Sequence, residues 1–215
     1  MRIVCMTNEG QLPMMKNMLN SAMKVGIDMT LFHCYIMSAN KEAANYNTLE
    51  FKKLTTRKFE VILANMQDTV LWVDNDIVFF ENCLKDVQSY PGTFVMQDDL
   101  WGYCTGFFLV RPSLFASSLM QQCIQRLNSR PQSSENDQHV FNSLYSSTPL
   151  VRLTKLPIDT YPNGDVYFNQ RKRSTAKILH NNYVSSTAEK VQKFKDNNLW
   201  DESDTGFNVV KKYYI

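Results

Sequence analysis

The chain has 215 residues, of which 44% are hydrophobic and 20% charged, and its 23 basic and 21 acidic residues give a formal net charge of +2. This composition excludes a disordered chain, and the small basic excess argues against a protein that binds nucleic acid by neutralising its phosphates. No apolar run approaches the ~18 residues of a membrane span, and the N-terminal residues turn polar too early for a signal peptide, so we expect neither.

The N-terminal half alternates short apolar strands with amphipathic helices. Residues 3–6 predict a strand, a helix follows from Pro13 to a cap at Gly26, and residues 30–37 predict a second strand. The apolar face of that helix consists of Met15, Met18, Leu19, Ala22 and Met23. After a loop over residues 38–48, a second helical stripe consists of Phe59, Ile62, Leu63 and Met66. Further extended runs are expected at 70–73, 77–80 and 94–97.

The C-terminal half continues the alternation. Residues 106–110 predict a central strand, and the helix after it carries Phe115, Leu119, Cys123 and Leu127. Helix starts with capping-box spacing are expected at Ser134 with Asp137 and at Ser186 with Glu189. Residues 161–174 predict a surface loop and residues 176–179 a late strand. This order indicates an α/β fold, a single domain over residues 1–215 with a mostly parallel central sheet flanked by helices.

The cysteines indicate the compartment. They are Cys5, Cys34, Cys83, Cys104 and Cys123. Their number is odd and no two form a Cys-x-x-Cys pair, so they predict reduced core thiols rather than a zinc site or disulfides. We therefore expect a cytoplasmic protein, or one of the host cytoplasm if it is viral.

An acidic interruption between two apolar runs suggests a metal site. In an extended chain Asp74 and Asp76 would project to the same side, with Asn75 facing away. Two carboxylates this close repel unless a cation lies between them, and Mg²⁺ or Mn²⁺ prefers such oxygen ligands. The alternative is a polar turn between strands.

Three histidines are present, and one of them lies where it could join the acidic pair. His180 ends the late strand, and an imidazole beside two carboxylates suits Mn²⁺ or Mg²⁺; the alternative is a solvent-exposed side chain. His33 is expected to be a satisfied sheet residue, and His139 to be exposed in the first turn of a helix.

Four segments resemble, in order, the motifs of the GT-A nucleotide-sugar glycosyltransferases. They are the Asp-x-Asp of residues 74–76 in its apolar strand, residues 104–111, residues 135–142, and the closing segments 156–164, 180–183 and 199–200. Cys104 stands where this family usually has Asn. The short chain without a membrane anchor is also similar to glycosyltransferase domains that glycosylate chlorella-virus capsids, which would make it part of a longer multidomain chain.

The resemblance implies a metal site and a donor site. Asp76 would ligate Mn²⁺ or Mg²⁺, Asp74 would bind the metal or the ribose hydroxyls, and His180 would complete the shell. The donor residues would be Thr7 and Asn8 at the edge of the first strand, Arg57 and Lys58 at a helix start, and Asn75. Plain alternatives are a strand-to-loop turn for the first pair and a solvated helix start for the second. The basic run 171–173 would fold over the diphosphate or be ordinary surface charge.

The sugar-side residues implied by the resemblance are acidic or carry an amide. Asp137 and Gln138 would stabilise oxocarbenium character at the anomeric carbon, although capping is an equally complete role for Asp137. Asp98, with Asp99, would contact sugar hydroxyls. Residues 1–100 would form the nucleotide-binding half and residues 101–215 the acceptor side.

The function expected from this resemblance is metal-dependent transfer of a hexose or deoxyhexose to a glycan or glycoprotein acceptor, such as a viral capsid glycan. The donor would be a nucleoside diphosphate sugar, UDP-glucose or another UDP-hexose or UDP-deoxyhexose. Two alternatives stay open: a phosphotransferase of the haloacid dehalogenase type, which also places Asp-x-Asp after a strand, and a non-catalytic nucleotide- or carbohydrate-binding module.

Overall fold

A seven-stranded sheet forms the centre of the computed structural model, which describes residues 1–37, 43–46, 48–130, 133–147, 151–171 and 173–215. Its spatial order is β7 (Leu153–Leu156), β5 (Phe94–Asp98), β6 (Tyr103–Val110), β3 (Val70–Val73), β1 (Arg2–Asn8), β2 (Phe32–Met37) and β9 (Lys211–Tyr214). β6 runs antiparallel to both of its neighbours, and the other adjacent pairs are parallel. The predicted α/β fold with a mostly parallel sheet is confirmed.

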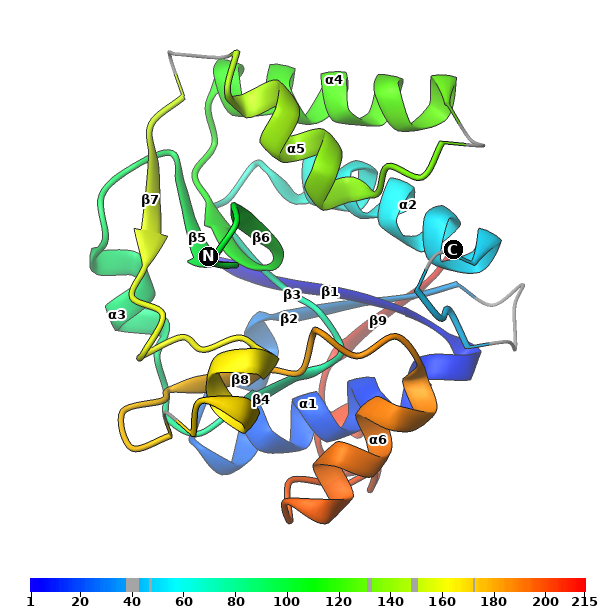
Figure 1. The fold of residues 1–215 in the computed structure, drawn as a ribbon, viewed down its shortest axis with the longest axis vertical. Coiled ribbons are helices and arrows are strands. Elements are labelled where there is room, and N and C mark those ends of the chain that lie inside the picture. The colour runs from blue at the N-terminus through cyan, green and yellow to red at the C-terminus, as the bar shows by residue number, and fades with distance from the viewer. Residues whose placement is uncertain (38–42, 47, 131–132, 148–150, 172) are drawn as a thin grey trace.

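Helices cover both faces of this sheet (Figure 1). The longer ones are α1 (Leu12–Lys24), α2 (Leu49–Asn65), α3 (Leu84–Ser89), α4 (Leu114–Ser129), α5 (Asp137–Tyr145) and α6 (Thr187–Asp196). The short ones are α7 (Thr205–Asn208), the 3₁₀ turns η1 (Glu9–Gln11) and η2 (Met29–Leu31), and the π-helical turn η3 (Asp165–Asn169). Within the described ranges no helix has the length and apolarity to cross a bilayer.

Alternating side chains of each strand enter two hydrophobic cores. In β3, Leu71 and Val73 pack in the core that contains α1, whereas Val70 and Trp72 pack in the core that contains α2, α4 and α5. A strand buried on both faces has to be apolar at every position, and this explains why residues 70–73 form a continuous apolar run. Both cores share one sheet, so the chain forms a single domain.

A second, two-stranded sheet connects distant parts of the sequence. β4 (Ile77–Phe79) pairs antiparallel with β8 (Ile178–His180), and Ile77 lies opposite His180. The backbone N–H of Asn181 also donates to the carbonyl of Asp76 at 2.9 Å. This pairing fixes the histidine beside the acidic segment.

Several predicted boundaries agree with the structure. β3 occupies the predicted residues 70–73, Pro13 lies in the first turn of α1, and Gly26 follows that helix with a φ of +73°. The side chain of Ser186 caps α6 as expected. All five cysteines are free and buried, as predicted.

Three predictions about local structure were wrong. α2 begins at Leu49, capped by Thr48, so Arg57 lies in the middle of that helix and not at its start. α5 is capped by Asn136, whose capping box pairs with His139, and not by Ser134. The segment 161–174 is not simply a surface loop, because it begins with the fully buried Tyr161 and contains η3. The predicted loop 38–48 lies partly outside the described residues, since 38–42 and 47 are not among them.

Candidate functional site

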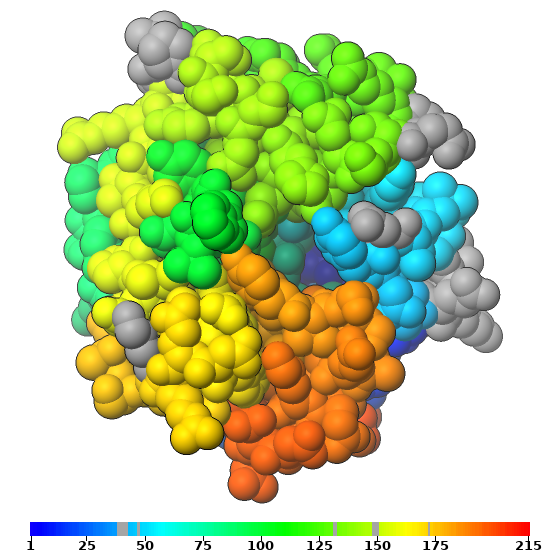
Figure 2. Space-filling view, in the orientation of Figure 1, coloured from blue at the N-terminus to red at the C-terminus, as the bar shows by residue number. Residues whose placement is uncertain are grey.

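A cleft of about 810 Å³ opens at one edge of the main sheet. The carboxyl ends of β1 and β3 and the start of the antiparallel β6 meet at this edge. Figure 2 shows the cleft as a hollow between the turn that precedes β6 (green), α5, α2 (cyan) and the segment that leads into α6 (orange). This is the edge at which open α/β sheets bind their ligands.

Asp74, Asp76 and His180 converge in this cleft. One ligand atom from each of the three lies within 4.8 Å of the others, and Asp76 Oδ1 is 3.3 Å from His180 Nε2. The acids are brought together by a turn, in which the N–H of Ile77 donates to the carbonyl of Asp74 at 3.3 Å. The predicted convergence is therefore present, but the reason given for it was wrong, because an extended chain does not continue from β3 into β4.

Gln97 determines which nitrogen of His180 faces the acids. Its Nε2 donates to the carbonyls of Tyr161 and Pro162, each at 3.0 Å, so its Oε1 is the atom that lies 2.8 Å from His180 Nδ1. Since an oxygen there can only accept, Nδ1 carries the hydrogen and Nε2 faces the carboxylate of Asp76. The lone pair of Nε2 and the carboxylate repel one another unless a proton or a metal ion lies between them. Metal-ligating histidines typically have a hydrogen-bond partner on the other ring nitrogen, as Gln97 is for His180.

Gly106 leaves the space that this arrangement needs. A Cβ at this position would lie 2.3 Å from His180 Cε1 and 2.9 Å from Asp74 Oδ2. A larger residue here would displace the imidazole of His180 or the carboxylate of Asp74. With its two carboxylates and one imidazole, the site fits a hard divalent cation such as Mn²⁺ or Mg²⁺.

Two lysines balance the charge of the carboxylates. Lys190 Nζ of α6 lies 2.6 Å from Asp76 Oδ2. Lys58 Nζ of α2 lies 2.6 Å from Asp137 Oδ2 and 3.2 Å from Asp74 Oδ1. Lys58 is buried in the cleft floor, whereas the side chain of Asp74 is 30% exposed and faces the opening. No sequence pattern predicts the pairing of Lys190 with Asp76.

Burial and ion pairing act against each other on these groups. Burial by itself raises the pKa of Asp76, but Lys190 and His180 outweigh it and hold the pKa of this carboxyl well below its usual range. Burial likewise opposes the charge on Lys58, and the carboxylates of Asp137 and Asp74 outweigh it, so the pKa of the ammonium is raised. The cleft therefore holds fixed charges of both signs near neutral pH.

The sugar-side candidates lie in different environments. Asp137 is buried, and its Oδ2 accepts hydrogen bonds from Lys58 and, at 2.7 Å, from Thr105 Oγ1. Gln138 lines the cleft, and its Nε2 donates to Asp99 Oδ2 at 2.7 Å. Asp98 does not line the cleft, because its carboxylate pairs with Lys155 at 2.8 Å. Of the two acids expected to contact sugar hydroxyls, Asp99 lines the cleft and Asp98 does not.

The predicted donor residues divide in the same way. Lys58 and Asn75 line the cleft, and the Oδ1 of Asn75 is buried with no hydrogen-bond partner among the described residues. Thr7 and Asn8 are buried and do not line it: the hydroxyl of Thr7 donates to the carbonyl of Asn8, whose side chain caps η1. Their alternative reading as a strand-to-loop turn therefore describes the structure.

The remaining basic candidates lie outside the cleft. Arg57 pairs with Glu60 and lines a separate pocket of about 440 Å³. Arg171 and Arg173 are exposed, and Nε of Arg173 donates to the carbonyl of Tyr167; residue 172 lies outside the described residues. Neither arginine lines the cleft.

The other two histidines and Cys104 lie in the environments expected of them. The Nδ1 of His33 forms a hydrogen bond with the Tyr213 hydroxyl, 3.0 Å away within the sheet, as expected. His139 is exposed in the first turn of α5, also as expected. The Sγ of Cys104 lies 3.4 Å from His180 Nδ1. The thiol is therefore a neighbour of the imidazole in the place where the resembling family has an amide.

Comparisons with known proteins identify the family of the chain. A family model described as nucleotide-diphospho-sugar transferase matches residues 16–194. An Arabidopsis thaliana protein named UDP-D-xylose:L-fucose alpha-1,3-D-xylosyltransferase MGP4 is 33% identical over 106 residues, which cover 45% of this chain and 29% of that protein. A Dictyostelium discoideum protein named UDP-galactose:fucoside alpha-3-galactosyltransferase is 26% identical over 225 residues, covering 83% of this chain and 34% of that protein. The chain thus spans about a third of the length of these two relatives.

A solved structure shares the fold. It is a glycosyltransferase involved in the glycosylation of the major capsid of PBCV-1, and it superposes with a TM-score of 0.63 at 16% identity over 91% of this chain and all of that one. At this level of identity the likeness concerns the fold alone. It agrees with the single-domain α/β architecture described above.

Proposed function

Because this chain belongs to the nucleotide-diphospho-sugar transferase family, we propose that it transfers a sugar from a nucleoside diphosphate donor to a glycan or glycoprotein in a reaction that needs Mn²⁺ or Mg²⁺. The observation that supports this most is the convergence of Asp74, Asp76 and His180, with Nε2 of the histidine facing a carboxylate, in the cleft at the sheet edge. These three side chains would hold a hard divalent cation, which would stabilise the negative charge of a diphosphate.

The relatives suggest which substrates to try first. The names of both relatives state a UDP-sugar donor, UDP-xylose for one and UDP-galactose for the other, and both state a fucose or fucoside acceptor with an alpha-3 linkage. We therefore propose a UDP-sugar donor for this chain and an acceptor that ends in fucose. The candidate donors therefore include a UDP-pentose as well as the UDP-hexoses and UDP-deoxyhexoses expected from the resemblance.

The residues of the cleft can meet the charge demands of this reaction. A bound divalent ion supplies Lewis-acid stabilisation of the departing diphosphate. Lys190 adds a positive charge beside Asp76, and Lys58 adds one beside Asp74. Asp137 fixes the position of Lys58, and Gln138, held by Asp99, presents an amide at the cleft wall near the reacting sugar. The nucleotide then lies along the β1 side of the cleft, and the acceptor on the side of residues 101–215.

Calorimetry with UDP tests the proposal. We expect UDP to bind with Mn²⁺ present and to lose most of its affinity in EDTA, and the Asp76→Asn variant to lose both metal-dependent binding and transfer, because a neutral amide is a poorer ligand for a hard cation. Asp196→Asn, an exposed change on α6 outside the cleft, is the matched control and should behave like the unaltered protein.

Three outcomes separate the alternatives. Equal UDP affinity in Mn²⁺ and in EDTA would contradict a metal-bridged diphosphate. Metal-dependent binding without release of sugar from any UDP-sugar would identify a binding module instead of an enzyme. Hydrolysis of p-nitrophenyl phosphate would support the phosphotransferase reading.

A further inference from the structure

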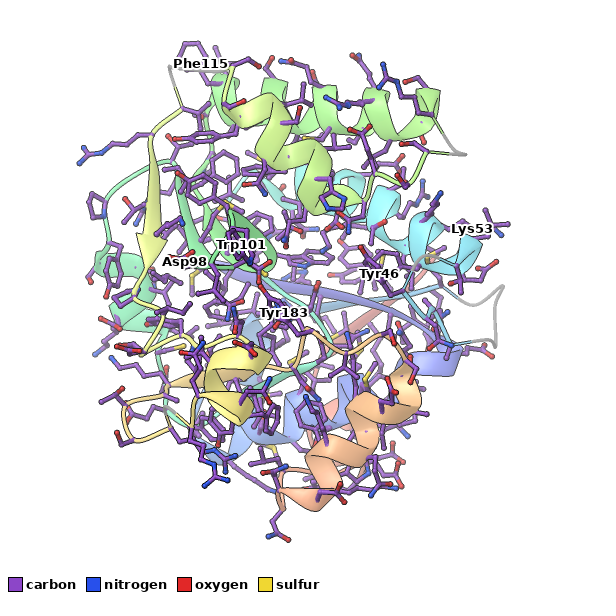
Figure 3. The ribbon with its side chains drawn as sticks, viewed as in Figure 1. Tyr46, Lys53, Asp98, Trp101, Phe115 and Tyr183 are labelled. Atoms are coloured by element: carbon purple, nitrogen blue, oxygen red, sulfur yellow. The ribbon has the colours of Figure 1, made fainter. Side chains whose placement is uncertain are left out.

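One end of the cleft carries an exposed aromatic residue that the proposed metal and donor sites do not use. Trp101 lies in the turn between β5 and β6, lines the cleft and is 93% exposed. Figure 3 shows its side chain in front of the sheet near the centre of the molecule. An indole this open to water has no packing role in the domain, and because it lines the cleft it is free to contact a ligand there.

The turn that carries Trp101 is held in place by hydrogen bonds. The N–H of Asp99 donates to the carbonyl of Gly102 at 3.2 Å, and the N–H of Trp101 donates to the carbonyl of Asp99 at 2.6 Å. Leu100 adopts a φ of +63°, a left-handed conformation that is costly for a branched side chain, and its N–H donates to Asp98 Oδ1 at 3.0 Å. The structure thus keeps the indole at the cleft mouth despite local strain.

A second aromatic ring is tied to the same turn. Tyr183 also lines the cleft, is 50% exposed and has a φ of +61°. Its hydroxyl donates to the carbonyl of Asp99 at 3.1 Å. The neighbouring Asn182 donates to Asp99 Oδ1 at 3.0 Å, and Gln138 donates to Asp99 Oδ2. Asp99 therefore links Trp101 and Tyr183, through its carbonyl, to the amides of Asn182 and Gln138, through its carboxylate.

The order of strands places these rings on the far side of the Asp74, Asp76 and His180 cluster from the β1 end of the cleft, where the proposed function puts the nucleotide. Asp74 follows β3, which lies between β6 on one side and β1 on the other. The Trp101 turn precedes β6, whereas Met6 and Gln11, at the end of β1 and just beyond it, line the opposite end of the cleft. A donor whose diphosphate lies at the cluster and whose nucleoside lies along β1 leaves the Trp101 end for the other substrate.

We infer that Trp101 and Tyr183 form the subsite that binds the acceptor saccharide, by packing their rings against the C–H face of a pyranose beside the amides of Gln138 and Asn182. This inference rests on the proposed function. Aromatic rings bury apolar area with little loss of conformational freedom, and nearby amides can bind ring hydroxyls. A 6-deoxy sugar such as fucose offers an additional methyl group to such a surface.

Two variants of Trp101 and one control variant test the inference. Trp101→Ala should raise the KM for methyl α-L-fucoside, or for whichever methyl glycoside of a sugar panel the protein accepts, at least tenfold, and Trp101→Phe should restore most of the loss. The affinity for UDP with Mn²⁺ and the slow hydrolysis of the donor by water should change less than twofold. Phe115→Ala is the matched control, since Phe115 is an equally exposed aromatic as Tyr183 but lies on α4, far from the cleft (Figure 3).

The outcomes distinguish this inference from its alternatives. A comparable loss of UDP affinity in Trp101→Ala would overturn it, because the ring would then hold the nucleoside. An unchanged KM for the acceptor would also overturn it. Saturation-transfer NMR with the same methyl glycosides measures binding without turnover. Loss of the glycoside signal in Trp101→Ala would support the subsite even if the protein transferred no sugar. Failure of metal-dependent UDP binding would count against the proposed function alone.

Discussion

The glycine beneath the metal cluster provides a sharp test of the site. In Gly106→Ala the new Cβ would lie 2.3 Å from His180 Cε1, about 1 Å short of the 3.4 Å at which ordinary contact begins, and 2.9 Å from Asp74 Oδ2. The backbone of Gly106 is not in the left-handed region, so alanine itself is tolerated there. The conflict is therefore with the two proposed ligands, and the histidine cannot retreat easily because Gln97 and the β4–β8 pairing hold it.

The displacement is large compared with what metal ligation tolerates. Ligand distances in a working site stay within about 0.2 Å of their ideal values, so a shift of about 1 Å removes His180 from the shell. Changes in outer partners alone cost about 10–100-fold in metal affinity. Loss of a direct ligand should cost at least about 100-fold, or about 2.8 kcal/mol at about 1.4 kcal/mol per tenfold. The overpacking should also lower the free energy of unfolding by about 1–3 kcal/mol.

Metal affinity and thermal stability have to be measured together. We expect Mn²⁺ titration to show the loss of affinity while the circular dichroism spectrum stays unchanged and Tm falls by several degrees. Gly206→Ala is the control, because its Cβ would also be crowded, though less tightly, at 2.9 Å from Asn20 Oδ1 and from the backbone carbon of Leu19, and it lies outside the cleft. It should lower Tm and leave Mn²⁺ affinity intact. Wild-type Mn²⁺ affinity in a folded Gly106→Ala protein would refute the assignment of His180 and Asp74 as ligands.

Three further predictions concern single side chains. His180→Ala should weaken Mn²⁺ binding and transfer less than Asp76→Asn, since water can fill one position of the shell, and the double variant should be little worse than Asp76→Asn alone; additive losses would indicate separate sites. Gln97→Leu should lower Mn²⁺ affinity about 10–100-fold, although Gln97 is not itself a proposed ligand, because its amide orients the imidazole of His180. An unchanged affinity would show that the amide does not orient the imidazole. Asp86 accepts hydrogen bonds from Lys177 and Tyr161, which hold its pKa below the usual value, so its stabilisation is present at neutral pH and is lost as the pH falls through the folded-state pKa. Asp86→Asn should lower Tm at neutral pH and make Tm fall less as the pH is lowered into the acid range. If Tm fell with acid as steeply in the variant as in the unaltered protein, Asp86 would not be the group responsible.

The sequence alone determined features that depend on neighbours along the chain. The continuous apolar run of residues 70–73 predicted a strand buried on both faces, and Pro13 and Gly26 marked the two ends of α1. The same local information singled out Asp74 and Asp76, since two acids between apolar runs are unusual. It also predicted His180 as their partner, although only as a residue at a strand end.

Contacts between distant segments were decided by the tertiary structure. Lys58 was expected at a helix start and instead lies in the cleft floor, because α2 begins nine residues earlier and packs beside α4, which brings Lys58 to Asp137 of α5. The choice between Asp98 and Asp99 depended on a turn with a left-handed residue, which alternation along a strand cannot foresee. Gln97 and Lys190 reach the cluster only through the folding of β8 and α6 onto β4, and nothing in their own sequence neighbourhoods records the His180 and Asp76 atoms that they contact.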